Sequence, residues 1–291
     1  MPDTAPLGID HTAPPFDHLR HIEWLAPVRS GHRSTEHARH QLYVGREKQN
    51  PVNVLIKVTS KPGLVYEQDL ANEISTLLTI NRDLPDSQHF PVVHDHGWLA
   101  DGRRYLITSL FDEFPLSTTI GTERDDARLV AHLRMAIEVS RVLGEIHRID
   151  IFHVDLNPMN ILYHATNNRP VIRIVDFESS YERARHLHGE FYSPPTTPGY
   201  SAPEVSHQAP DARSDLFSLG AVLYTALAGY RWTDHGEVST RVRADTELDA
   251  DLKAALLKAV DPVPDKRYPS VRKFQAALTA YLEQIWPGRT L

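Results

Sequence analysis

The first part of the chain has the apolar spacing of strands, with one helical interruption. HQLYVGRE and VNVLIKV are short, rich in β-branched residues and separated by turn residues, which favours two strands. The stretch 67–80 instead repeats apolar residues at the period of a helix. Its apolar positions are Leu70, Ile74, Leu77 and Leu78. Segments 91–99 and 103–111 predict two further strands around a turn at Asp101 and Gly102.

From about residue 122 the pattern becomes helical. The stretch 122–147 begins with acidic residues, which suit the positive end of a helix dipole. Its apolar positions are Leu129, Leu133, Ile137, Val142 and Ile146. A strand pair is expected at 160–163 and 171–177, followed by a proline-rich loop and then helices. The pattern therefore predicts a small strand-rich lobe around one helix, followed by a larger helical lobe.

Composition narrows the possible classes of function. Of the 291 residues, 41% are hydrophobic, so the chain has enough apolar residues for a core and is not disordered throughout. The net charge of −7 argues against a general nucleic-acid binder, so no nucleic-acid partner is expected. The chain has no cysteine, which excludes disulfides, thiol nucleophiles and cysteine metal sites.

No segment has the features of a membrane span or an export signal. Residues 1–15 contain four prolines and no apolar core, so we expect a flexible arm. The longest apolar run, 216–230, is shorter than the roughly 20 residues that a bilayer span needs. We therefore expect a cytoplasmic protein without a membrane span.

Five polar residues occur in an order that suggests phosphoryl transfer. Lys57 ends a strand, Glu73 lies on the next helix, and Asp155 and Asn160 share the segment HVDLNPMN. Asp176 follows the next strand. Phosphoryl transfer needs a cation on the nucleotide phosphates, oxygen ligands for Mg²⁺ and a carboxylate near the attacking hydroxyl. These five residues supply all three.

The motifs around these residues resemble those of the eukaryotic-type (Hanks-type) protein kinases. VLIK resembles V-A-I-K, HVDLNPMN resembles H-R-D-L-x-x-x-N, DFE resembles D-F-G, and SAPE resembles A-P-E. The resemblance covers about residues 20–285 and implies an α+β, bilobal fold. It assigns a small antiparallel β-sheet lobe with one main helix to 16–111 and a larger, mostly helical lobe to 112–286.

The resemblance also implies roles for the five polar residues. Lys57 is expected to bind the phosphates of ATP and to be oriented by Glu73. Asp155 is expected to accept the proton of a Ser or Thr hydroxyl on a protein substrate. Asn160 and Asp176 are expected to hold Mg²⁺.

Further residues match the family's nucleotide site and its structural supports. The residues matched to the adenine site are Leu55, Thr108, Ser109, Phe111 and Leu162. Glu204 of SAPE is expected to pair with Arg267, and Asp215 to brace the loop that carries Asp155. Thr197 matches a residue that contacts the catalytic aspartate.

The chain departs from the family pattern in the glycine-rich loop. Gly31 stands alone where the family has G-x-G-x-x-G, whose backbone N–H groups approach the phosphates. Arg29, Arg33 and Arg39 either substitute side-chain cations for these donors or lie on a solvated hairpin. Leu55 replaces the usual alanine and lies on the strand face of Lys57, toward the adenine.

Three further departures lie in the second half. Glu178 replaces the glycine of D-F-G, Val154 replaces the arginine of H-R-D, and Asn157 replaces the usual lysine. The loop HVDLNPMNIL also resembles that of aminoglycoside and choline kinases. Three functions follow: a Mg²⁺- and ATP-dependent Ser/Thr protein kinase, which is favoured, a pseudokinase that binds a partner, and a small-molecule kinase. The substrate and oligomeric state stay open.

Overall fold

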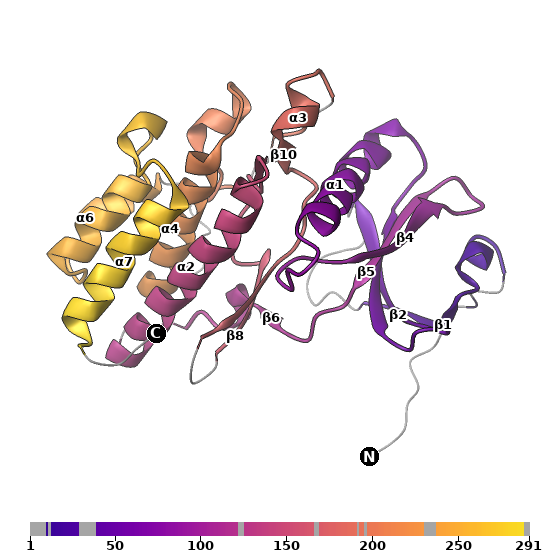
Figure 1. Cartoon of the computed structure of the whole chain (residues 1–291), viewed down its shortest axis with the longest axis horizontal. Coiled ribbons are helices and arrows are strands. Elements are labelled where there is room, and N and C mark those ends of the chain that lie inside the picture. Colours follow the sequence, from indigo (N-terminus) through magenta and orange to yellow (C-terminus); the bar gives the residue numbers. More distant parts are fainter. Residues whose placement is uncertain are drawn as a thin grey trace, which may run out of the picture. The chain divides into compact units, whose positions relative to one another are not determined.

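The computed structural model describes residue 10 and the segments listed at the end of this paragraph (Figure 1). The chain forms two compact units, Met1–Asp112 (unit 1) and Glu113–Leu291 (unit 2). Most of the arm expected at 1–15 lies outside the described residues. The described segments are 13–28, 39–121, 125–165, 169–190, 192–194, 197–229 and 237–287.

Unit 1 is built on an antiparallel sheet of five strands in the order β1-β2-β3-β5-β4. A short 3₁₀ turn, η1 (Asp17–Leu19), precedes the sheet, and the helix α1 (Leu64–Asp83) contacts β3, β4 and β5. The strands are β1 (Ile22–Pro27), β2 (His40–Glu47), β3 (Asn53–Thr59), β4 (Val93–Trp98) and β5 (Arg104–Ser109). The four strands and the helix expected from the sequence between 40 and 111 all form.

Alternation along β3 separates a core face from a functional face. Val54, Ile56 and Val58 are fully buried in one apolar cluster, because side chains two residues apart share a face of the strand. Leu55 and Lys57 point to the opposite face, where Lys57 meets α1. The other cluster members are Phe16, Leu19, Ile22, Leu25, Tyr43, Leu99, Tyr105 and Ile107.

The helix α1 buries most, but not all, of the apolar positions that recur along its sequence. Leu70, Ile74, Leu77 and Ile80 are buried, whereas Leu78 is exposed. Successive residues of an α-helix are rotated by about 100° around its axis. Leu78 is therefore turned away from its neighbour Leu77, which is buried. Of the four apolar positions that the sequence marks on this helix, Leu78 is thus the one that faces solvent.

Unit 2 is dominated by helices that pack side by side (Figure 1). The long helix α2 contacts α4 and α7, and α4 also contacts α6 and α7. Asp125 caps α2 by accepting a hydrogen bond from the backbone N–H of Arg128, which satisfies a donor left free at the helix start. The helices are α2 (Asp126–His147), α3 (Arg183–His186), α4 (Ala212–Ala228), α5 (Val238–Ala244), α6 (Ala250–Ala259) and α7 (Val271–Ile285).

The helix α4 forms the centre of unit 2. It is buried continuously from Ser214 to Leu227, as its apolar sequence predicts. It begins with a capping box between Asp211 and Ser214, and it ends at Gly229 with a φ of 71°. Gly220 permits close packing, because a β-carbon there would lie 2.8 Å from Val260 Cγ1.

Short strands hold the loops of unit 2 that carry polar residues. One small sheet has the order β6-β8-β9, and β7 pairs with β10. The loop 153–160 therefore runs between β7 and β8, and the segment 175–180 between β9 and β10. The strands are β6 (Phe114–Pro115), β7 (Ile151–Phe152), β8 (Ile161–His164), β9 (Val171–Ile174) and β10 (Tyr181–Glu182), and the 3₁₀ turns are η3 (Leu116–Thr118), η4 (Pro203–Ser206) and η5 (Pro264–Lys266).

None of the described helices combines the length and the apolar character that crossing a membrane requires.

Candidate active site

In unit 1, β3 and α1 bring together the lysine and the glutamate that the sequence singled out. Lys57 Nζ donates to Glu73 Oε2 at 2.7 Å, across 16 residues of sequence. The side chains are 14% and 5% exposed, so water screens this ion pair only weakly. The pair fixes the ammonium group of Lys57 on the face of the sheet that α1 covers.

The register between β3 and β5 places Leu55 directly opposite Thr108. Leu55 is half-buried and Thr108 is buried, and both share the face of Lys57. The backbone N–H of Ser109 donates to Val92 O at 3.0 Å, and that of Leu110 donates to Asn53 O at 3.3 Å. Both of these backbone N–H groups are therefore already hydrogen-bonded within unit 1.

One of the three arginines near the divergent loop is described. Arg39 pairs with Asp69 on α1, so its guanidinium group already has a carboxylate partner within unit 1. Gly31, Arg29 and Arg33 lie outside the described residues.

In unit 2, the loop that follows β7 is held by a carboxylate from α4. Asp215 is fully buried, and its two oxygens accept hydrogen bonds from the backbone N–H groups of His153 at 2.9 Å and Val154 at 2.7 Å. This confirms the expectation that Asp215 braces the loop. Val154 has a φ of 67°, which is unfavourable for a β-branched residue, so these hydrogen bonds stabilise a strained backbone.

Asp155, the next residue, is half-buried and hydrogen-bonded. Thr197 Oγ1 donates to Asp155 Oδ1 at 2.6 Å, as the resemblance implied, and Asn160 Nδ2 donates to the Asp155 backbone carbonyl at 2.9 Å. Burial raises the pKa of Asp155, while the hydrogen bond from Thr197 opposes that shift and the nearby Asp176 adds to it. A carboxylate in this setting has a raised basicity and a fixed orientation.

Asn160 and Asp176 lie close together in unit 2. The backbone N–H of Val175 donates to Asn160 O at 3.0 Å, which ties the residue before Asp176 to Asn160. The amide NH₂ of Asn160 is turned to the Asp155 carbonyl, so its side-chain oxygen points the other way. Amide and carboxylate oxygens are the hard donors that Mg²⁺ prefers.

Two residues that depart from the family pattern have structural roles in these loops. Asn157 donates to the Asp155 backbone carbonyl at 3.0 Å and accepts from the N–H of Met159 at 2.9 Å, so it shapes the turn itself. Asp176 has a φ of 67°, whereas the φ of Glu178 is not positive. The positive φ therefore falls on the aspartate rather than on the residue that replaces glycine.

The SAPE glutamate forms a buried ion pair. The guanidinium group of Arg267 donates to both oxygens of Glu204 at 2.8 Å, and Ser214 Oγ donates to Glu204 Oε1 at 2.7 Å. Burial alone raises the pKa of Glu204, but the hydrogen bonds from Arg267 and Ser214 outweigh it and hold that pKa below its ordinary value. The pairing expected between Glu204 and Arg267 is confirmed.

Sequence reasoning missed His147, at the end of α2. Its Nε2 lies 2.7 Å from Asp215 Oδ2, so it shares the carboxylate that holds the loop. No local signal marks this histidine, because Asp215 follows 68 residues later. Only the packing of α2 on α4 brings the two residues together.

Comparison with protein families gives a match that covers most of the chain. The protein kinase domain family matches residues 41–285. Serine/threonine-protein kinase Pkn1 of Myxococcus xanthus is 30% identical over 203 residues, which cover 62% of this chain and 28% of Pkn1. Serine/threonine-protein kinase ULK3 of Mus musculus is 29% identical over 257 residues, which cover 82% of this chain and 51% of ULK3. The matched regions thus span about half or less of these relatives.

A solved structure has the same fold. The kinase domain of Mycobacterium tuberculosis PknI superposes with a TM-score of 0.59 at 21% sequence identity, over 88% of this chain and 95% of that domain. This likeness confirms the α+β fold with its antiparallel sheet and its mostly helical second part.

Proposed function

Since the chain belongs to the Hanks-type protein kinase family, we propose that it transfers the γ-phosphate of ATP to Ser or Thr hydroxyls of a protein substrate. The observation that carries the proposal is the environment of Asp155. Its carboxylate is half-buried, oriented by Thr197 and set in a loop that Asp215 holds from the core. Such rigidity is what a general base for a hydroxyl group requires.

In the proposed reaction the oxygen of the substrate hydroxyl forms a bond to the γ-phosphorus, and the bond from that phosphorus to the β,γ-bridging oxygen breaks to release ADP. Asp155 accepts the hydroxyl proton. Lys57, oriented by Glu73, binds phosphate oxygens of ATP. The half-buried Leu55 and Leu162 and the buried Thr108 line the adenine site in this proposal, with the Ser109 and Phe111 backbones as its polar partners.

The oxygen donors of Asn160 and Asp176 fit a magnesium ion. Two protein ligands suffice, because Mg²⁺ usually keeps several waters and takes its other ligands from substrate phosphates. When bound, the metal neutralises charge that builds up on the phosphate oxygens during transfer. The proposed compartment is the cytoplasm, which supplies ATP and Mg²⁺.

The proposal assigns the family's two lobes to residues 16–111 and 112–286. Residues 1–15 are the arm in this assignment. Lys57, Glu73 and the adenine residues on β3 and β5 belong to the first lobe, and Asp155, Asn160 and Asp176 belong to the second.

The test is transfer of labelled phosphate to a generic protein substrate, with and without Mg²⁺. The wild-type chain should label Ser and Thr residues, and Asp155→Asn should keep its nucleotide affinity while transfer falls sharply. Equal turnover by wild type and Asp155→Asn would show that Asp155 is not the base.

The same assay separates the other two readings of the sequence. Nucleotide binding without transfer to any protein would favour the pseudokinase. Labelling of small hydroxyl compounds in place of proteins would favour the small-molecule kinase.

A further inference from the structure

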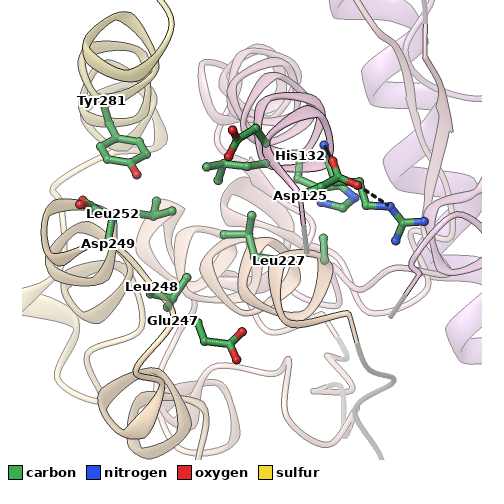
Figure 2. Close-up of a pocket in the computed structure, with 12 residues that line it drawn as sticks. Asp125, His132, Leu227, Glu247, Leu248, Asp249, Leu252 and Tyr281 are labelled. Atoms are coloured by element: carbon green, nitrogen blue, oxygen red, sulfur yellow. Dashed lines mark hydrogen bonds and ion pairs between the residues drawn. The ribbon is translucent and has the colours of Figure 1, made fainter. Parts of the chain in front are cut away.

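Unit 2 contains a cavity of about 220 Å³ at the start of α2, which none of the roles above uses (Figure 2). Its walls come from four helices and from the segment before α6, so its shape is set by helix packing rather than by one loop. All of its lining residues are described. They are Asp125, Asp126, Arg128, Leu129, His132, Ala226, Leu227, Glu247, Leu248, Asp249, Leu252 and Tyr281.

The floor of the cavity is apolar. Leu227 at the end of α4, Leu252 on α6 and Leu129 on α2 contribute aliphatic side chains, and Figure 2 shows Leu227 and Leu252 between the polar residues of the two sides. Tyr281 of α7 closes one side, and its ring is buried. An alkyl chain placed here would leave water, which favours binding by about 0.8 kcal/mol for each methylene group.

The rim is acidic. Exposed carboxylates from two segments line it, Asp125 and Asp126 on one and Glu247 and Asp249 on the other, and Figure 2 shows Asp125 on the side opposite Glu247 and Asp249. Asp125 and Asp249 also cap α2 and α6 through their side-chain oxygens. A cation at the mouth of the cavity would therefore meet carboxylates from two sides.

The basic residues of the lining offset only part of this charge. Arg128 Nε lies 3.9 Å from Asp125 Oδ2, and its guanidinium group is turned against Gly121, which does not line the cavity. His132 is buried, and burial lowers its pKa to about 4, so its ring is neutral at pH 7. Its Nδ1 has no hydrogen-bond partner among the described residues.

We propose that this cavity binds a small amphiphilic cation, an alkylammonium or alkylguanidinium compound. Its apolar chain occupies the leucine-lined floor, and its head group lies among the carboxylates of Asp125, Asp126, Glu247 and Asp249. The site is separate from the catalytic residues, because it involves the beginning of α2 and the end of α4, whereas His147 and Asp215 lie at the opposite ends of these helices. The proposal therefore does not depend on the kinase reaction.

The test is calorimetric titration of the full chain with matched probes. Butylammonium, hexylammonium and octylammonium should bind with affinities that rise about fourfold per added methylene until the cavity is filled. Hexanol should bind more weakly than hexylammonium, and hexanoate should not bind. Saturating Mg·ATP should leave the affinity for hexylammonium unchanged. Equal binding of the three six-carbon probes would overturn the proposal, and so would a lack of binding by all the ammonium ions.

Two variants assign the binding to this cavity. Glu247→Gln should weaken hexylammonium binding about two- to fivefold at low salt, and high salt should shrink the difference. Glu283→Gln is the control, because Glu283 is exposed on α7 but does not line the cavity. Both positions are exposed, so both variants should fold. A Glu247→Gln variant that binds hexylammonium as tightly as the Glu283→Gln control would place the binding elsewhere and overturn the proposal.

Discussion

The hydrogen bond from Thr197 to Asp155 joins two residues that lie 42 positions apart in the sequence. It favours the ionised form of a carboxylate whose pKa burial raises. At the scale of single residues, this contact sets both the orientation and the basicity of the proposed base.

Thr197→Val removes the donor and keeps the shape of the side chain. The pKa of Asp155 should then rise further, so the acidic limb of the pH profile of kcat/KM should move to higher pH. At the pH optimum, kcat should fall about 10- to 100-fold, because a hydrogen bond to a charged group contributes about 1.5–3 kcal/mol. Thr197→Ser keeps the hydroxyl and should retain the wild-type profile. A profile unchanged in Thr197→Val would argue against Asp155 as the titrating base.

At the scale of elements, the ion pair between Lys57 and Glu73 joins β3 to α1. Lys57→Met leaves the Glu73 carboxylate, which is 5% exposed, without this cation. Urea unfolding should show a loss of about 3–5 kcal/mol, because an uncompensated buried charge is costly. Adding Glu73→Leu should recover most of this stability, whereas phosphate transfer should stay lost in both variants. Recovery of transfer in the double variant would reduce the pair to a structural role.

The contact of Glu204 with Arg267 makes the stability of unit 2 depend on pH. The folded pKa of Glu204 lies below its ordinary value of 4.5, so its ionised form stabilises the fold at pH values above about 4.5. That contribution is lost as the pH falls through the lower, folded pKa. Thermal melting should therefore show a difference in melting temperature between wild type and Glu204→Gln at pH 7 that shrinks as the pH falls below 4.5. A gap that persists at low pH would contradict this linkage.

In the segment from Asp176 to Glu204, one of the arginines already has carboxylate partners. Arg185 pairs with Glu182 at 2.7 Å and Glu190 at 3.1 Å. Val154 is buried and offers no cation to a phosphate, and Ser180 is buried with its hydroxyl on the Phe177 carbonyl. The ion pairs of Arg185 with Glu182 and Glu190 are thus contacts of the same kind as those between an arginine and a phosphate.

We therefore expect activity that does not need phosphorylation of this segment. Phosphatase-treated protein should transfer phosphate at a constant initial rate, without preincubation with ATP. Ser193 is half-buried, and Thr196 lies outside the described residues. A lag that disappears after autophosphorylation of Ser193 or Thr196 would refute the expectation.

At the scale of the whole molecule, ligand binding should raise the melting temperature through mass action. ATP at 100 times its dissociation constant should stabilise the chain by about 2.7 kcal/mol in the presence of Mg²⁺ or Mn²⁺, and far less in EDTA. Asp176→Asn should remove most of this metal dependence, whereas Asp155→Asn should keep it. Equal shifts with and without metal in the wild-type chain would contradict the assignment of Asn160 and Asp176 as ligands.

Much of the fold could be predicted because its signals are local. Short runs rich in β-branched residues and separated by turn residues mark β2 and β3, and the apolar stretch 216–230 marks the buried helix α4. The order of the motifs around Lys57, Asp155 and Asp176 was enough to indicate a kinase family. These features depend on neighbouring residues, so they are readable without knowledge of the tertiary structure.

Other features were decided only by the tertiary structure, because they depend on residues that are distant in sequence. The positive φ of Val154 is held by Asp215, the pairing of Leu55 with Thr108 depends on strand register, and His147 meets Asp215 across two packed helices. The exposure of Leu78 likewise depends on which face of α1 packs inward. The acidic cavity is the clearest case, since its carboxylates belong to segments more than 100 residues apart that only helix packing brings together.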